Sequence, residues 1–126
     1  MRAVLDTSVL IATDVPELVG ELAISAASLA ELHFGVLVTP DSGVRAERLR
    51  RLSELQRKFA ALPIDEDVAI SYGRLAAAVA SSGRQPRSRV MDLLIAATAH
   101  AHAARLYTRN AQGLVGIEDI VDIVAV

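Results

Sequence analysis

The sequence predicts one α/β domain in which a mainly parallel sheet of four to five strands is covered by helices. Short apolar segments, which are typical of buried strands, alternate along the chain with longer segments in which apolar residues recur at helical spacing. The chain has 126 residues, a common size for one domain, and it contains no internal repeat or linker. Residues 1–126 are therefore expected to form a single unit around one core.

Five short apolar segments are the expected strands, and most of them are followed by turn or cap residues. In chain order they are residues 3–5, 22–24, 61–64, 105–107 and 120–124. Strands that alternate with helices pair in parallel through right-handed crossovers. Functional sites in such sheets lie beyond the carboxyl ends of the strands, so the residues that follow each strand are the first candidates for function.

Five segments of helical period lie between these strands. They are residues 9–12, 28–38, 44–59, 66–81 and 90–104. Three prolines lie where the helices are expected to end, at Pro40, Pro63 and Pro86. The helix over 44–59 is amphipathic, because charged residues surround a single apolar stripe. The stripe consists of Leu49, Leu52, Leu55 and Phe59.

A formal net charge of −2 and the absence of cysteine narrow the class of protein. Without thiols there is no disulfide framework and no thiolate zinc site, so a cytoplasmic protein is expected and any metal must bind to oxygen or nitrogen. No segment reaches the roughly 20 apolar residues that span a bilayer, so no membrane association is expected. The acidic balance and the few aromatic residues, two Phe and two Tyr, argue against binding RNA by bulk charge or by a stacking platform. Any contact with RNA must be local.

Asp6 is the first candidate functional residue, because it follows the first expected strand directly and is followed by Thr7 and Ser8. By itself it is most simply explained as the N-cap of a helix, since Asp, Thr and Ser satisfy free helix amides. Thr108 and Asn110 follow a later strand in the same way, and an ordinary strand-to-turn transition would account for them too. Both strand-end positions are expected at one edge of the sheet.

Two further carboxylates lie in helices that are otherwise apolar. Glu31 is surrounded in sequence by Leu29, Ala30 and Leu32, which leave little polar face, and a buried carboxylate must be paired or bind a cation. Asp92 lies in the first turn of the most apolar helix, where the helix dipole alone would favour it. Both helix positions can face the edge that carries Asp6.

Three carboxylates that converge at one edge repel one another strongly unless a cation binds them. A site made only of oxygen ligands suits Mg²⁺, with Mn²⁺ as a substitute, because these ions keep several waters and use few carboxylates together with substrate phosphate. The chemistry expected of such a site is phosphodiester hydrolysis, in which the ion lowers the pKa of a bound water. The sequence thus predicts Asp6, Glu31 and Asp92 as metal ligands.

The ordered motifs resemble those of PIN-domain proteins. They are Asp6-Thr7-Ser8, Ser28-x-x-Glu31-Leu32-x-x-Gly35, Asp92-x-x-Ile95-Ala96-Ala97 and Thr108-x-Asn110. The chain length and the span of the motifs are similar to those of the VapC toxins of bacterial toxin–antitoxin pairs. The resemblance implies a PIN fold, a metal-dependent endoribonuclease acting on RNA of the tRNA or rRNA class, a homodimer, and a VapB-type antitoxin that wraps the toxin and blocks its site.

The resemblance also assigns roles to individual residues, and it has one departure. Asp6, Glu31 and Asp92 correspond to the metal-binding acids, and Thr108 and Asn110 to the polar motif that positions water, metal or phosphate. Many relatives carry another aspartate two or five residues after the threonine, where this chain has Asn110 and Gly113. We therefore expect one well-bound Mg²⁺, and a PIN-like protein that binds RNA or antitoxin without cleaving is the alternative.

Other features of the sequence have simpler explanations or exclude rival classes. Arg84, Arg87 and Arg89 form either a solvated loop or a guide for phosphate, and the helix over 44–59 is a mixed-charge solvent face that could border an antitoxin groove. The three histidines are expected to be structural. A receiver domain needs a lysine near its last strand, whereas the only lysine is Lys58 in a mid-chain helix. An aspartate-nucleophile phosphatase would need a second aspartate at Ser8.

Overall fold

The computed structural model describes all 126 residues and contains a five-stranded, all-parallel sheet in the order β3-β2-β1-β4-β5. The expected fold class is therefore confirmed. The strands are β1 (Arg2–Leu5), β2 (Glu21–Ser25), β3 (Ala60–Leu62), β4 (Arg105–Thr108) and β5 (Ile123–Ala125).

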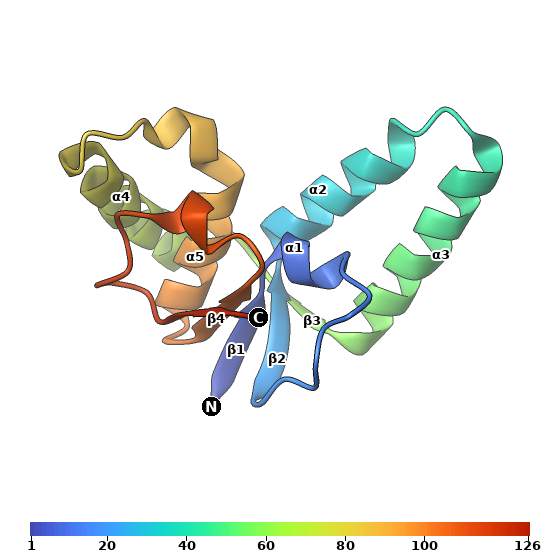
Figure 1. The fold of residues 1–126 in the computed structure, drawn as a ribbon, viewed down its shortest axis with the longest axis horizontal. Coiled ribbons are helices and arrows are strands. Elements are labelled where there is room, and N and C mark those ends of the chain that lie inside the picture. Colours follow the sequence, from blue (N-terminus) through green and yellow to red (C-terminus); the bar gives the residue numbers. More distant parts are fainter.

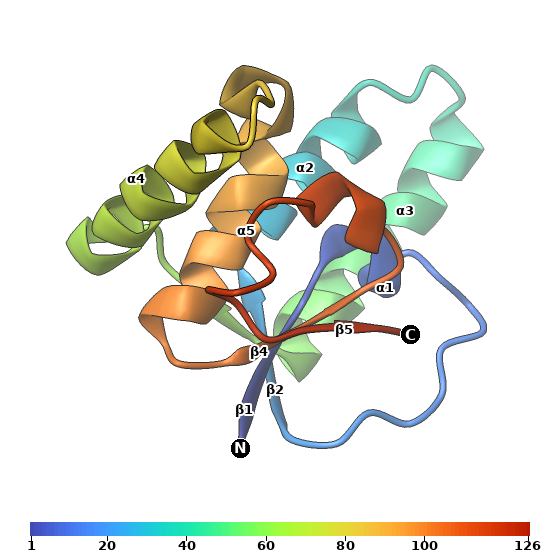
Figure 2. The same cartoon turned by 60° about the vertical axis from the view of Figure 1, so that its left-hand side comes forward.

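Helices cover both faces of the sheet. The α-helices are α1 (Thr7–Leu10), α2 (Ala26–Leu37), α3 (Ser42–Lys58), α4 (Glu66–Ser81) and α5 (Val90–Ala101), and two short 3-10 helices span Pro86–Arg89 and Ala111–Leu114. The helices α2 and α3 form an arm on one flank of the molecule, while α4 and α5 lie on the other, with α1 between the two groups (Figure 1). The helices α4 and α5 run side by side, and the chain after β4 passes close to α1 (Figure 2).

Two apolar clusters lie on opposite faces of the sheet, because successive side chains of a strand point to opposite sides. Val4 and Leu106 belong to the larger cluster, which α4 and α5 cover. Ala3, Leu5 and Tyr107 belong to the smaller one, which also contains residues of α1 and is packed against residues of α3. Every strand residue of β1 after Arg2 is buried, so Asp6 directly follows an apolar buried segment.

The topology places the candidate site at the point where the direction of winding changes. From β1 the chain adds β2 and then β3 on one side, and afterwards crosses over to add β4 and β5 on the other. The carboxyl ends of β1 and β4 are therefore neighbours whose following segments diverge, which is where open α/β sheets bind ligands. Asp6 follows β1, and Thr108 is the last residue of β4.

Several expected boundaries are wrong by a few residues, for reasons that concern turns and caps. The last strand is residues 123–125 rather than 120–124, because the preceding residues turn and place Ile117 and Val121 in the core. The helix expected to reach residue 104 ends at Ala101, and Ala103 adopts a positive φ of 50°. Pro86 begins a 3-10 helix, since a proline fits the first helical turn.

The remaining corrections concern the first helix, the third strand and the stripe on α3. The first helix spans residues 7–10 rather than 9–12, because Asp6 caps it. The third strand spans residues 60–62 and is followed by Pro63. Leu49 is 49% exposed and does not share the burial of Leu52. No helix is long and apolar enough to cross a membrane.

Candidate active site

Asp6 lies at the centre of a hydrogen-bond network and is only 7% exposed. Its Oδ1 accepts from the Thr7 amide at 2.9 Å, which confirms the expected N-cap. Its Oδ2 accepts from the hydroxyls of Ser8 at 2.9 Å and Thr108 at 2.7 Å. An ionised carboxylate offers about four acceptor positions, so these three donors orient Asp6 and still leave acceptor capacity on Oδ1. Capping and a site role are compatible here.

Glu31 is held next to Asp6 by Thr7. The Thr7 hydroxyl donates to Glu31 Oε1 at 2.7 Å and also lies 3.0 Å from the Ser28 hydroxyl. Glu31 is one turn after Ser28 on α2, so both side chains face the start of α1. The half-buried carboxylate thus points toward the carboxyl end of β1, as the sequence predicted.

Asp92 approaches from α5 on the other side. The pKa of Asp92 is raised above its ordinary value, first because the carboxyl is half-buried and then because the negative charges of Asp6 and Glu31 oppose its ionisation. Arg89, in the turn before α5, acts in the opposite direction. The Asp92 carboxylate also borders Gly113, as the Asn110 side chain does, so Asp92 lies at the same edge of the sheet as Asn110. We call this edge, with Asp6 and Glu31, the rim.

Thr108 and Asn110 complete this rim from the end of β4. The Thr108 side chain is fully buried and, besides donating to Asp6, accepts from the Asn110 backbone amide at 2.9 Å. The Arg109 amide donates to the Ser8 hydroxyl at 3.0 Å. Hydrogen bonds therefore link Thr108 to Asp6 and to the Asn110 backbone, and Thr7 links Asp6 to Glu31. Asp92 is affected by the charges of Asp6 and Glu31.

A buried pair of hydroxyls fixes the two helices that carry Glu31 and Asp92. Ser25, the N-cap of α2, and Thr98 of α5 are both fully buried, and their hydroxyl oxygens lie 2.9 Å apart. Glu31 lies six residues after Ser25, and Asp92 lies six residues before Thr98. At about 1.5 Å per residue each acid stands roughly 9 Å along its helix from this pair, so the pair sets the spacing of the two carboxylates.

Thr7 and Ser8 are the residues whose role the sequence analysis missed. Both were assigned only to capping, yet one bonds Glu31 and the other bonds Asp6. Their position directly after Asp6 was the available signal. Because a hydroxyl reaches only a few ångströms, its partner on α2 or β4 depends on how those elements pack, which the sequence alone does not specify.

Several charged and polar residues near or outside the rim have bonding partners of their own. Hydrogen bonds from the backbone amide of Glu118 itself and then from the Gly116 amide lower the pKa of the Glu118 carboxyl. Asp122 pairs with Arg105 at 3.0 Å. The His100 ring nitrogen Nδ1 lies 2.8 Å from the Ser71 hydroxyl, on α4. In the arginine-containing loop, Arg89 donates to the Val115 carbonyl at 3.1 Å and is the arginine that acts on Asp92.

The donor set is of the kind that Mg²⁺ binds, since it consists of carboxylates, hydroxyls and a carboxamide. No group of three His, Asp or Glu side chains is arranged around one point in the structure, because the Glu31 carboxylate is turned to Thr7 and Asp6 is bonded on both oxygens. Mg²⁺ usually keeps several waters and takes only one or two carboxylates directly. The residues therefore fit such an ion if some of these side chains contact it through water and not directly.

The all-parallel sheet that carries this site is the fold of a known family. The chain belongs to the PIN domain family, whose model matches residues 3–114. It is 39% identical to Ribonuclease VapC5 of Mycobacterium tuberculosis (strain ATCC 25618 / H37Rv) over 113 residues, which are 85% of this chain and 82% of the relative. It is 37% identical to Ribonuclease VapC8 of the same strain over 99 residues, 75% of this chain and 88% of the relative.

The solved structures lead to the same family. The crystal structure of VapBC-5 from Mycobacterium tuberculosis, a member of the VapBC family of toxin-antitoxin systems, matches with a TM-score of 0.82 and 33% identity, over 99% of this chain and 97% of that chain. FitAcB from Neisseria gonorrhoeae matches with a TM-score of 0.78 and 25% identity, over 96% and 95% of the two chains.

Proposed function

We propose that this chain is the toxin of a type II toxin–antitoxin pair and an endoribonuclease that hydrolyses RNA phosphodiester bonds. The observation that carries the proposal is the rim itself, where Thr108 and Ser8 orient Asp6, Thr7 orients Glu31, and Asp92 responds to both acids. The names of the relatives, Ribonuclease VapC5 and Ribonuclease VapC8, support RNA as the substrate. The VapBC-5 structure supports an antitoxin as the partner.

In the proposed mechanism Asp6, Glu31 and Asp92 would hold Mg²⁺, or Mn²⁺ in its place. When bound, the ion supplies a water of lowered pKa and neutralises charge on the scissile phosphate. Thr7, Ser8 and Thr108 keep the carboxylates in place, so little reorganisation is needed during the reaction. Asn110 contributes a neutral amide, and Arg89 offers a positive charge beside Asp92 for substrate phosphate.

RNA cleavage by the purified chain tests this proposal. Incubation with a mixture of tRNA and rRNA in millimolar Mg²⁺ is expected to give discrete fragments, and an excess of EDTA is expected to stop the reaction. Cleavage that continues unchanged in EDTA would contradict the metal-dependent mechanism. The alternative, a PIN-like protein that binds RNA or antitoxin without cutting, is favoured by the neutral Asn110 at the rim and predicts retarded but intact RNA.

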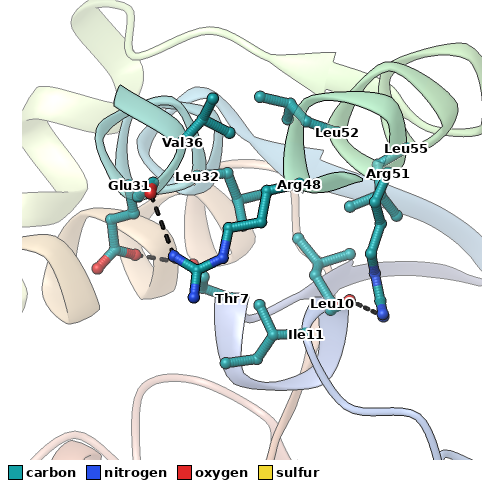
Figure 3. Close-up of a pocket in the computed structure, with 11 residues that line it drawn as sticks. Thr7, Leu10, Ile11, Glu31, Leu32, Val36, Arg48, Arg51, Leu52 and Leu55 are labelled. Atoms are coloured by element: carbon teal, nitrogen blue, oxygen red, sulfur yellow. Dashed lines mark hydrogen bonds between the residues drawn. The ribbon is translucent and has the colours of Figure 1, made fainter. Parts of the chain in front are cut away.

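We further propose that an antitoxin segment lies in an apolar groove next to the rim. A cavity of about 440 Å³ extends from Thr7 and Glu31 along α3, between α1 and α2 (Figure 3). A second cavity of about 490 Å³ continues along α3 and shares Leu10, Arg51 and Leu55 with the first. A segment placed in this groove would both bury apolar surface and cover Glu31, which explains how one partner binds and inhibits.

Charge and exposure around the groove indicate the chemistry of that segment. Arg48 and Arg51 line the first cavity together with Glu31, and Arg51 and Lys58 line the second together with Glu17. The lining has more basic than acidic residues, so an apolar segment with acidic residues fits it best. The family resemblance also implies a homodimer, and α2 leaves Phe34 and Leu37 exposed by 69% and 75%, a surface available to a second copy.

Substitution of Ile11 by glutamate is expected to weaken binding of the cognate VapB-type antitoxin about 30-fold, because it places a charge at the mouth of the groove. Ile11 lines the first cavity and is 60% exposed, so its replacement leaves the core intact. The matched control is Ile70→Glu, since Ile70 is 66% exposed on α4, on the other flank of the molecule (Figure 1). Equal affinities of the two variants, measured by calorimetry, would place the antitoxin elsewhere.

A further inference from the structure

The Asn110 carboxamide occupies the space that a side chain at position 113 would need. A Cβ atom built on Gly113 would lie 2.8 Å from Asn110 Nδ2 and 3.3 Å from Asn110 Cγ. The same Cβ would lie 3.4 Å from Asp92 Oδ2. Carbon and nitrogen atoms that are not bonded do not approach to 2.8 Å without displacement. Gly113 therefore leaves open a space beside Asp92, and Asn110 fills it.

Position 113 is glycine because a side chain would not fit there, and not because its backbone conformation requires glycine. The positive φ glycines of the chain are Gly20, Gly83 and Gly116, so Gly113 has a backbone that other residues adopt. It lies within the 3-10 helix Ala111–Leu114, where its amide donates to the Asn110 carbonyl at 3.1 Å. Glycine in a helical turn loses more conformational entropy on folding than alanine. The close approach of Asn110 explains why a residue with a Cβ atom would not fit here without displacement.

Asn110 also connects two of the site carboxylates. Its backbone amide donates to the Thr108 hydroxyl, which in turn donates to Asp6 Oδ2. Its side chain shares the space over Gly113 with Asp92 Oδ2. The backbone of Asn110 is thus linked to Asp6, while its neutral carboxamide and the Asp92 carboxylate border the same space over Gly113 without a hydrogen bond between them.

We infer that Asn110 and Gly113 act as one coupled pair, in which the glycine provides the space that lets the Asn110 carboxamide confine the Asp92 carboxylate by packing beside it, while the rim keeps three negative charges. Asn110 is a positioning residue in this account, because it acts through Asp92. The inference rests on the proposed function in one respect, namely that the positioned carboxylate binds a divalent ion.

A double-mutant cycle with Mn²⁺ as the probe tests the coupling. Asn110→Ala and Gly113→Ala are each expected to weaken Mn²⁺ binding about 10-fold, measured by calorimetry, since the first removes the carboxamide and the second displaces it. The double variant is expected to bind no more weakly than Asn110→Ala alone, because no carboxamide is left to displace. Gly73→Ala is the matched control, since a Cβ there meets no atom within 4 Å. Losses that multiply to about 100-fold in the double variant would overturn the inference.

A charge substitution tests the second half of the inference. Asn110→Asp keeps the shape of the side chain but adds a fourth negative charge, so we expect tighter Mn²⁺ binding by about 10-fold and a lower melting temperature of the metal-free protein. Unchanged values of both would show that Asn110 does not face Asp92. Melting temperatures of the metal-free single and double variants of Asn110→Ala and Gly113→Ala measure the coupling independently. Additive losses of stability in the double variant would also overturn the inference.

These readouts separate the inference from the proposed function. Coupled Mn²⁺ affinities in a protein that leaves RNA intact would refute ribonuclease activity and support the pair. Mg²⁺-dependent RNA cleavage together with independent effects at positions 110 and 113 would support ribonuclease activity and refute the coupled pair.

Discussion

Replacement of Asp6 by asparagine is expected to lower the rate of RNA cleavage at least about 10³-fold, because the carboxylate at the centre of the rim loses its charge. Asparagine retains a side-chain oxygen that can cap α1 or accept from Thr108, so the fold is expected to persist. The measurement is the initial rate of fragment formation in Mg²⁺, together with the loss of growth inhibition when the variant is expressed in cells.

Asp65→Asn is the matched control for this substitution. Asp65 caps α4 just as Asp6 caps α1, with its carboxylate accepting from the Val68 amide, but it is not part of the rim. Cleavage at the wild-type rate is expected for this control. Asp6→Ala should also abolish cleavage, but it additionally removes the cap, at about 1 kcal/mol, and an acceptor for the buried Thr108 hydroxyl. An Asp6→Asn protein that cuts RNA as fast as the wild type would refute the assigned role of Asp6.

Replacement of Asp92 by asparagine is expected to have opposite effects on stability with and without metal. The pKa of Asp92 in the folded protein is raised by burial and by Asp6 and Glu31, so the folded state binds a proton more readily than the unfolded chain. Stability is therefore lost as the pH rises from the unfolded value, about 3.9, through the folded pKa, and the loss persists at neutral pH. Metal-free Asp92→Asn should melt above the wild type at pH 7, and the difference should vanish below about pH 4.

In the presence of Mn²⁺ the wild type should melt above Asp92→Asn. At a concentration 100 times its dissociation constant, a ligand of the folded state stabilises it by about 2.7 kcal/mol, which corresponds to roughly 10 °C in a domain of this size. The wild type is expected to gain this stabilisation and Asp92→Asn to gain little of it. Melting curves at pH 7 with and without Mn²⁺ provide the measurement. Equal Mn²⁺ stabilisation of the two proteins would remove Asp92 from the metal site.

The sequence predicts the acids of the rim because their positions depend on simple regularities. Asp6 follows an apolar strand, and the carboxyl ends of parallel strands share one edge. Glu31 and Asp92 interrupt helices that are otherwise apolar, and a charge in such a place needs a partner. The structure places all three on one rim, although the ligands and the metal itself remain predictions.

The rest of the site depends on packing that a linear pattern does not contain. The hydrogen bond from Thr7 to Glu31 requires a particular packing of α1 against α2. The contact between the Ser25 and Thr98 hydroxyls requires the start of α2 to pack against α5 at Thr98. Gly113 appeared in the sequence only as a missing acid, whereas the structure shows it beneath the Asn110 carboxamide. The boundary of the last strand was wrong because the buried residues Ile117 and Val121 belong to turns.

The most direct test of the central claim is to map RNA ends in cells after brief expression of the wild type and of Asp6→Asn. Cleavage at the rim of Asp6, Glu31 and Asp92 predicts new ends at a small set of positions in the wild type and their absence with the variant. Identical ends with both proteins, or none with a folded wild type, would contradict the claim that this rim cleaves RNA.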